Sequence, residues 1–328
     1  MTTHTNGHAP AVEVRQLTKT YPGGVEAVKA IDFSVAPGEV FGLLGPNGAG
    51  KSTTIGMLTT TIAPTSGAAA LTGFDVAKQP LKARSVSSVV FQEAVVDGGL
   101  TGRANLELHA DLWGIDTRVG AERIADLTQT LGVGDILDRE VDSYSGGQRR
   151  RLEIARALAS EPRVLFLDEP TVGLDPRIRF ELLDAIAGLR QRDGMTIVLT
   201  THYLEEAQRL CDRVAIIHAG SIVALDTPAA LLAGLGDELL ELRVDGDTAV
   251  ALAALGARGI AAADAYVVGQ TLTVPLHDAT AGEALAAIDE AGLSTSAIRS
   301  RRPTLDDVYL RLTGSELPVA ARDPYERT

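Results

Sequence analysis

The sequence contains little cysteine, few aromatic residues and no long apolar run. Cys211 is the single cysteine among 328 residues, so an internal disulfide is excluded, and this usage fits a reducing compartment. No run of about 18 apolar residues occurs, so we do not expect the chain to span a membrane by itself. Met1–Pro10 is polar and lacks the apolar segment of a signal peptide, which predicts a short disordered tail.

Basic residues are also in the minority. Lys and Arg together number 30 against 43 Asp and Glu, which gives a net charge of −13. This balance disfavours a surface that binds duplex nucleic acid, and we expect no nucleic-acid partner. The hydrophobic share of 45% suits a globular protein with a sizeable core, and the length predicts about two domains.

The most informative stretch of the sequence is a phosphate-binding motif. The apolar run Val40–Leu44 predicts a buried strand, and it enters Gly45–Ser52, which matches GxxxxGK[ST]. A helical pattern follows, and a glycine-rich loop between a strand and a helix directs backbone N–H groups at an anion. Lys51 is placed to reach the β- and γ-phosphates, and the hydroxyl of Ser52 to hold Mg²⁺.

Two adjacent carboxylates follow a second apolar strand. Val164–Leu167 predicts a fully buried strand that ends at Asp168 and Glu169. Ligands of α/β proteins bind at the carboxyl ends of the strands, so Asp168 can hold Mg²⁺ there and Glu169 can activate a water molecule. The competing interpretation is an ordinary solvated strand end.

The order of strands and helices predicts two domains. Strands that alternate with helices up to about residue 234 indicate a largely parallel sheet flanked by helices, with a helical subdomain at about 93–160. Gly234-Leu235-Gly236 is the best linker. Residues 239–314 have the order βαββαβ, which resembles a ferredoxin-like unit and includes a hairpin that turns at Gly269-Gln270. A polar tail is expected at 315–328.

Several residues have competing interpretations at this stage. Trp113, the only tryptophan, lies on an apolar helical stripe with Leu106 and Ala110, and we interpret it as core rather than as docking surface. Tyr21 ends a strand and is either plain packing or a platform for a base. Arg149–Arg151 is interpreted as a solvated helix face, and Ser145–Gln148 as a second small-residue helix start suited to an anion.

Four motifs together resemble one family. GPNGAGKST at 45–53, YSGGQ at 144–148, LFLDEPTVGLD at 165–175 and TTH at 200–202 occur in the order and spacing of the ATP-binding cassette (ABC) ATPases. The resemblance covers roughly residues 11–234. It implies a P-loop NTPase core of α/β class with a mixed sheet and a helical subdomain, followed here by a small α+β domain. It also implies hydrolysis of ATP with Mg²⁺ by a homodimer.

The resemblance assigns binding roles to individual residues. Tyr21 is similar to the aromatic residue that stacks on adenine. The triphosphate cradle would consist of Gly45, Pro46, Asn47, Gly48, Ala49, Gly50, Lys51, Ser52 and Thr53. The signature that contacts ATP on the other subunit would consist of Ser145, Gly146, Gly147 and Gln148. The signature begins with Tyr144 where Leu is commonest, which leaves these phosphate contacts intact.

The remaining roles concern catalysis and the metal. Asp168 resembles the metal-site aspartate and acts there with Ser52; Glu169 resembles the catalytic base. Gln92 is similar to the glutamine that senses Mg²⁺ and the attacking water. His202 resembles the residue that contacts the γ-phosphate, and Asp175 the residue that communicates across the dimer.

The C-terminal extension narrows the resemblance to one group of exporters. The segment 302–314, RPTLDDVYLRLTG, is similar to the daunorubicin-resistance type, whose members are ATP-binding subunits of ABC type-2 exporters of drugs, antibiotics or lipids. Many members carry Met at position 148 and Gln at position 202, where this chain has Gln148 and His202. The resemblance implies a separate transmembrane permease, contacted around Leu100–Ile115, and a location at the cytoplasmic face of the membrane.

A different class of function stays open alongside this one. A soluble ABC ATPase could act on ribosomes or DNA without a membrane partner, but such proteins usually have two cassettes or a long coiled-coil insertion. Here one cassette is present, and no heptad pattern is sustained. The C-terminal module could also regulate the ATPase in response to a ligand. The sequence does not reveal the transported substrate, because specificity belongs to the permease.

Overall fold

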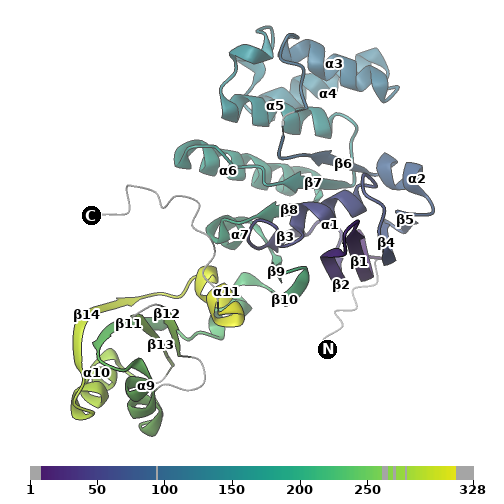
Figure 1. The fold of residues 1–328 in the computed structure, drawn as a ribbon. Helices are drawn as coiled ribbons and strands as arrows, with labels where there is room; N and C mark the ends of the chain where they lie inside the picture. The colour runs from purple at the N-terminus through teal and green to yellow at the C-terminus, as the bar shows by residue number, and fades with distance from the viewer. Residues whose placement is uncertain (1–8, 94, 261–264, 269–270, 278, 315–328) are drawn as a thin grey trace. The chain divides into compact units, whose positions relative to one another are not determined.

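The computed structural model describes residues 9–93, 95–260, 265–268, 271–277 and 279–314 (Figure 1). Most of the expected N-terminal tail, the tail at 315–328 and the turn at Gly269-Gln270 lie outside these residues. The chain forms two compact units, Met1–Leu225 and Asp226–Thr328. This boundary precedes the linker expected at Gly234, because the short helix α8 (Pro228–Ala233) packs against α11 (Leu305–Thr313) of the second unit.

A six-stranded sheet is the centre of the first unit. Its strand order is β10-β9-β3-β8-β7-β6, and the pairs β9–β3, β3–β8, β8–β7 and β7–β6 are parallel. The strands are β3 (Val40–Leu44), β6 (Ser87–Val90), β7 (Val164–Asp168), β8 (Thr196–Thr201), β9 (Arg213–His218) and β10 (Ser221–Asp226). β3, β7 and β8 are buried along their whole length, which explains their continuous apolar sequences.

A second, antiparallel sheet covers part of this core. Its order is β2-β1-β4-β5, and its strands are β1 (Val12–Tyr21), β2 (Val25–Val35), β4 (Ser66–Leu71) and β5 (Phe74–Asp75). Residues that alternate along β1 and β2 enter a common core with β3 and β7. Phe33 stacks on Phe41 with ring centroids 5.1 Å apart, so the two sheets are joined by direct packing.

The helices of the first unit form a flanking layer and a helical arm (Figure 1). The flanking helices are α1 (Lys51–Leu58), α2 (Pro80–Ser85), α6 (Pro176–Asp193) and α7 (Leu204–Leu210). The arm contains α3 (Gly102–Leu112), α4 (Thr117–Thr130), α5 (Gly146–Leu158) and two 3₁₀ turns, Gly134–Ile136 and Val141–Ser143. α3, α4 and α5 pack on one another, and within the described residues no helix is long and apolar enough to cross a membrane.

The second unit has the expected ferredoxin-like order. Its sheet runs β12-β13-β11-β14, and all its strand pairs are antiparallel. The elements are β11 (Glu238–Asp245), α9 (Thr248–Ala257), β12 (Tyr266–Val268), β13 (Thr271–Leu276), α10 (Ala281–Glu290) and β14 (Ser294–Arg301). α9 and α10 bury an apolar face against this sheet, so the unit has a core of its own.

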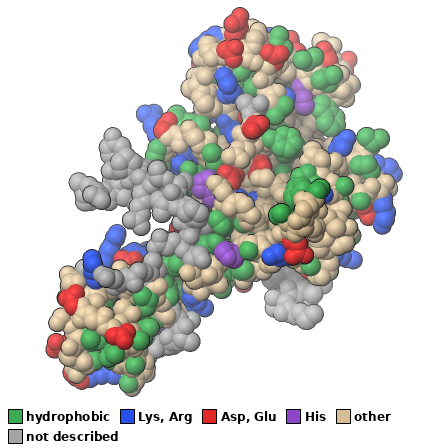
Figure 2. Space-filling model, in the orientation of Figure 1, with side chains coloured by type: hydrophobic (Ala, Val, Ile, Leu, Met, Phe, Trp, Pro, Cys, Tyr) green, Lys and Arg blue, Asp and Glu red, His purple; other side chains and the backbone are tan. Residues whose placement is uncertain are grey.

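Two interpretations of surface and core residues were wrong. Trp113 is 41% exposed, because it follows the last turn of α3 and is not part of the helix's buried face. Arg150 is only 7% exposed and is not part of a solvated face. In Figure 2, acidic and basic side chains are interspersed on the face shown, without a continuous basic stripe.

Candidate functional site

The phosphate-binding loop follows β3 and opens α1, as its sequence predicts. Gly50 precedes α1 with a φ of 108°, and a Cβ there would lie 2.4 Å from the carbonyl oxygen of Ala27. A Cβ on Gly45 would lie 2.2 Å from the carbonyl oxygen of Ile217. Glycine is therefore required at both ends of the loop, because the neighbouring backbone leaves no space for a side chain.

Lys51 is buried at the base of this loop. Its side chain is 3% exposed, and Nζ donates to the carbonyl oxygens of Gly45 at 2.8 Å and Pro46 at 3.1 Å. Nζ also lies 3.0 Å from Oε1 of Glu169. The buried ion pair between Lys51 and Glu169 therefore joins the phosphate loop to the acidic pair, although about 120 residues separate these two segments in the sequence.

Ser52 and Asp168 meet in front of the loop. Ser52 Oγ donates to Asp168 Oδ1 at 3.2 Å, and Asp168 is 5% exposed at the end of β7. A hydroxyl oxygen and a carboxylate oxygen are suitable ligands for Mg²⁺, which fills the rest of its coordination shell with water and phosphate oxygens. Within the described residues no three His, Cys, Asp or Glu side chains are arranged to hold a metal by themselves.

Glu169 is held in a strained backbone conformation. Its φ is 46°, in the left-handed region that residues other than glycine rarely adopt, and such strain is concentrated at functional sites. Its backbone N–H donates to Thr200 Oγ1 at 2.9 Å. His202 Nδ1 lies 3.2 Å from Oε2, on the other side of the carboxylate from Lys51.

The charge state of Glu169 follows from these neighbours. Burial by itself would raise the pKa of Glu169, but His202 and Lys51 together lower it below its ordinary value. The carboxylate is therefore ionised at neutral pH. It can accept a hydrogen bond from a water molecule.

Thr200 belongs to the candidate site, and the sequence analysis missed it. Its hydroxyl donates to Asp168 Oδ1 at 2.5 Å and accepts from the Glu169 N–H. It thereby fixes both carboxylates relative to β8. The signal was present, because Thr200 is the first residue of the TTH motif and β8 pairs in parallel with β7 beside it.

Two further residues predicted for the site, Tyr21 and Gln92, differ from each other in their surroundings. Tyr21 is half-buried at the end of β1, and its hydroxyl lies 3.4 Å from Thr53 Oγ1, so it borders the phosphate loop. Gln92 is exposed beyond the end of β6, and in the described part of the chain its side chain makes no hydrogen bond with Ser52 or Asp168. The role of Gln92 stays a prediction.

The residues around Gln92 are held by α5. The Arg150 guanidinium donates to the carbonyl oxygens of Phe91 at 2.6 Å and Gln92 at 3.0 Å. It also pairs with Glu153 at 2.9 Å, and Glu153 accepts from the Val95 N–H at 2.9 Å. Arg150 is buried for this reason, and the helix that begins at the signature clamps the backbone on both sides of Gln92.

The signature forms the N-terminus of α5. Ser145 caps the helix, since its Oγ accepts from the Gln148 N–H at 3.3 Å while Gln148 Oε1 accepts from the Ser145 N–H at 3.0 Å. Ser145 and Gly146 are exposed, so the start of this helix lies at the surface. Within the described residues, no hydrogen bond joins residues 145–148 to residues 45–53.

The unusual Tyr144 has a structural explanation. Its ring is buried, and its hydroxyl donates to the Ile136 carbonyl at 2.6 Å. A Cβ on Gly102 would lie 2.3 Å from this hydroxyl, so the glycine at the start of α3 makes room for the larger ring. Tyr144 anchors the signature to the helical arm and does not itself face the exposed helix N-terminus.

Asp175 lies at the start of α6. Its Oδ1 accepts from the Ile178 N–H at 3.1 Å, so it is the N-cap of that helix. Gly147 approaches the same helix closely, because a Cβ there would lie 2.3 Å from Ile178 Cγ2. The beginnings of α5 and α6 are thus packed together. The role of Asp175 in contact between two copies stays a prediction.

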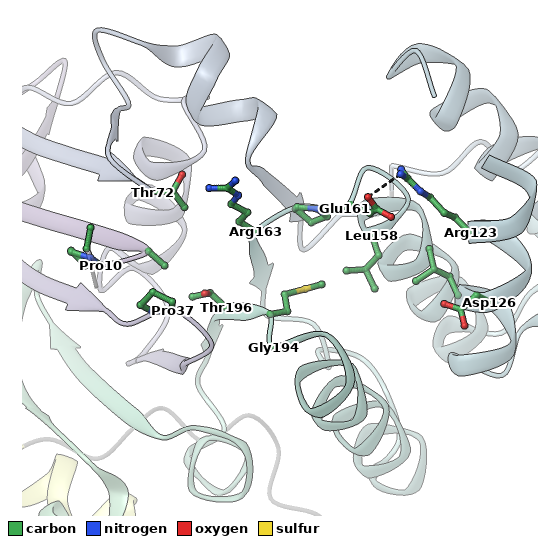
Figure 3. Close-up of a pocket in the computed structure, with 15 residues that line it drawn as sticks. Pro10, Pro37, Thr72, Arg123, Asp126, Leu158, Glu161, Arg163, Gly194 and Thr196 are labelled. Atoms are coloured by element: carbon green, nitrogen blue, oxygen red, sulfur yellow. Dashed lines mark ion pairs between the residues drawn. The ribbon is translucent and has the colours of Figure 1, made fainter. Parts of the chain in front are cut away.

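A cavity of about 880 Å³ lies elsewhere in the first unit (Figure 3). Pro37, Arg163 and Thr196 border it at the amino ends of β3, β7 and β8, whereas the phosphate loop and the acidic pair lie at the carboxyl ends. Arg123 of α4, paired with Glu161 at 2.8 Å, borders the opposite side. This cavity is distinct from the candidate nucleotide site.

Comparison with known proteins agrees with this geometry. Residues 28–172 match the family described as "ABC transporter". The chain is 40% identical to the daunorubicin/doxorubicin resistance ATP-binding protein DrrA of Streptomyces peucetius, over 93% of this chain and 92% of that protein. It is 37% identical to the Nod factor export ATP-binding protein I of Rhizobium etli, over 94% of each chain.

A solved structure shares the fold of the cassette. It is a dimeric ATP-binding cassette in a post-hydrolysis state bound to ADP and Pi, with a TM-score of 0.60 and 25% identity, over 66% of this chain and 98% of that one. This chain is therefore similar to such ATPases in both sequence and fold. It also contains the phosphate loop, the acidic pair and the signature described above. The chain belongs to the ATP-binding, ATP-hydrolysing subunits of ABC transporters, in the group of the drug-resistance exporter proteins.

Proposed function

We propose that two copies of this chain bind two ATP molecules with Mg²⁺ between them, and that their closure drives a separate permease. One observation carries the proposal. Lys51, Asp168, Glu169 and His202 converge at one edge of the sheet. Among the residues that the structure describes, no hydrogen bond or ion pair joins the signature at 145–148 to any of them. A second copy, placed head to tail, would supply the missing anion-binding helix start.

Different residues of one copy would bind the phosphates, the Mg²⁺ ion and the adenine. Lys51 and the N–H groups at the start of α1 would hold the β- and γ-phosphates, and Ser52 with Asp168 would hold Mg²⁺. The ion would neutralise phosphate charge in the bound nucleotide. Tyr21 would stack on adenine, since it lies beside Thr53 at the end of the loop.

Glu169 is proposed as the base, with His202 beside it. A carboxylate between a lysine and a histidine stays ionised, so it can orient a water molecule and take its proton. His202 would lose its contact to the γ-phosphate after hydrolysis. Binding and loss of that phosphate would then shift the equilibrium between a closed dimer and an open one.

The helical arm offers a surface for the permease. Leu108 and Leu112 of α3 are 50% and 77% exposed, and Trp113 directly after this helix is 41% exposed. All three lie within the region 100–115 that the sequence indicated. Such side chains gathered near one helix end fit a protein partner better than solvent. The relatives are named for resistance to daunorubicin and for Nod factor export, so we propose an antibiotic or lipid-like cargo and a peripheral position at the cytoplasmic face of the membrane.

The alternative, an ABC ATPase that acts on ribosomes or DNA, is not favoured. The relatives named above are resistance and export proteins, and acidic and basic side chains are mixed on the face in Figure 2. The net charge of −13 also opposes a nucleic-acid surface.

The substitution Glu169→Gln tests the proposal. We expect ATP turnover to fall by about 10²–10⁴-fold, the usual contribution of a general base, while ATP still binds. The variant should accumulate as a dimer with ATP and Mg²⁺, as measured by light scattering after size exclusion. Glu161→Gln, at an exposed position outside the site, is the matched control and should turn over ATP at the wild-type rate. A full turnover rate for E169Q, or no dimer with ATP, would contradict the proposal.

A further inference from the structure

Glu206 is a completely buried carboxylate that the roles above do not use. It lies on α7 and has no solvent exposure. Thr171 Oγ1 donates to Oε1 at 2.5 Å, and Thr201 Oγ1 donates to Oε2 at 2.8 Å. Each carboxylate oxygen therefore holds the hydroxyl of a different segment of the chain.

The two threonines are neighbours of the proposed reacting groups. Thr171 follows Glu169 by two residues, and Thr201 directly precedes His202. Since His202 Nδ1 and Glu169 Oε2 lie 3.2 Å apart, the two segments and Glu206 form a closed ring of contacts. The distance between the proposed base and the histidine is thereby set from behind, by a group that touches neither of them.

The ring continues to Tyr203 and α6. The N–H of Tyr203 donates to Thr201 Oγ1 at 2.9 Å, and the rings of His202 and Tyr203 lie 4.2 Å apart. The Arg179 guanidinium of α6 stacks 3.9 Å from the Tyr203 ring, and its Nε lies 3.6 Å from Glu206 Oε1. Asp175 is the N-cap of α6, so the helix that follows Asp175 also contacts this carboxylate through Arg179.

Burying the Glu206 carboxylate costs free energy, and stability alone does not explain why a carboxylate is there. Burial raises the pKa of Glu206, and two hydroxyl donors with one ion pair at 3.6 Å replace its hydration incompletely. Apolar residues of similar volume often replace a buried charge at no loss of stability. A polar side chain is needed here only if both threonine hydroxyls must be held at once, because one side chain then has to supply two hydrogen-bonding atoms.

We propose that Glu206 is a positioning residue for ATP hydrolysis, which fixes His202 against Glu169 and couples both to the segment that leads to Asp175. This inference rests on the proposed roles of Glu169 and His202. When His202 shifts on gain or loss of the γ-phosphate, Thr201 shifts with it, and Glu206 transmits the shift to Thr171. ATP binding itself does not depend on Glu206, since the phosphate loop lies on other elements.

The test compares Glu206→Ala with Glu205→Ala in the full chain. Glu205 is the adjacent residue, exposed and paired with Arg179 at 3.6 Å, so it is a matched control. We expect E206A to lower kcat by about 10–100-fold while the dissociation constant of ATP changes less than twofold, and E205A to change neither. Glu206→Gln should recover much of kcat, because an amide accepts from one threonine and donates to the other. Equal losses in E206Q and E206A, or a full kcat in folded E206A, would overturn the proposal.

A double variant separates positioning from general stability. H202A with E206A should turn over ATP no more slowly than H202A alone, because both changes act through the same histidine. Independent, additive losses would assign Glu206 a merely structural role. If E206A does not fold, Thr201→Val tests the positioning role in its place. We expect this variant to have a lower kcat and unchanged ATP binding. An active E169Q would refute the proposed function itself, whereas inactive E169Q with fully active T201V and E206A would refute only this inference.

Discussion

Asp307 of the second unit provides a sharp test of how the C-terminal motif stabilises this protein. It lies at the start of α11 and is 3% exposed. Arg301 donates to both of its oxygens at 2.7 Å, and Tyr266 Oη donates at 2.9 Å. The N–H and hydroxyl of Thr304 also donate to it, at 2.8 and 2.9 Å. The perturbation is Asp307→Ala, which removes the acceptor of all these bonds.

The expected loss follows from the burial of the partners. Removal of one member of a buried ion pair typically costs about 3–5 kcal/mol, because the other member is left without compensation. Arg301 retains 26% exposure of its side chain and a bond to Glu241 at 2.7 Å, so the lower end, about 3 kcal/mol, applies. For a domain of 60–100 residues each kcal/mol lowers Tm by roughly 4–8 °C, which gives a shift of about 12–24 °C.

The full chain allows both units to be followed separately. Differential scanning calorimetry reports the melting of the second unit, and tryptophan fluorescence reports the first, because Trp113 is the only tryptophan. Asp306→Ala is the control, since Asp306 is the exposed neighbour. A shift of the second-unit transition below about 4 °C in D307A, or an equal shift in D306A, would refute the reasoning.

The pH dependence of stability gives an independent check that ionised Asp307 stabilises the second unit. Burial by itself would raise the pKa of Asp307, but Arg301 and Thr304 lower it below its ordinary value. A carboxyl whose folded pKa is lower than its unfolded pKa contributes stability above the unfolded value, and this stability is lost as pH falls through the folded value. The difference between wild type and D307A should therefore be largest at neutral pH and should shrink in acid.

Two further predictions concern the first unit. Arg150→Gln should accelerate amide exchange of Phe91 and Gln92 and lower ATP turnover about tenfold, whereas Arg151→Gln, on the same helix but bonded to Glu181 and Leu131, should leave that exchange unchanged. Leu112→Asp should reduce the fraction of the chain that sediments with membranes of its native host, without loss of ATP turnover in solution. Leu81→Asp, at an equally exposed leucine of α2, is its control, and equal effects of the two would exclude α3 as the docking surface.

The local elements of the cassette could be predicted from the sequence because their signals are short-range. The buried strand before Gly45, the loop and the helix after it are specified by an apolar run and by glycines whose Cβ atoms would clash. The acidic pair at the end of β7 follows from the same kind of pattern. The βαββαβ order of the second unit was also visible, because each element carries its own periodicity.

Contacts between distant segments could not be predicted in this way. Arg150 looked like part of a solvated triple of arginines, and only the position of β6 beside α5 reveals that it holds the backbone of Gln92. Trp113 looked like a core residue, but the end of α3 leaves it at the surface. Helical periodicity gives the face of a helix, not what covers that face.

The sequence by itself predicted a site for a nucleoside triphosphate and membership of the ABC ATPases, because a phosphate site is built from consecutive backbone N–H groups. Tertiary structure alone decided how Glu169 is held. Its ionised state depends on Lys51 and His202, and its placement on Thr200 and Glu206, which come from other strands and helices. Charge and hydrogen-bond energies depend on distance in space, and folding sets those distances between residues that the sequence separates.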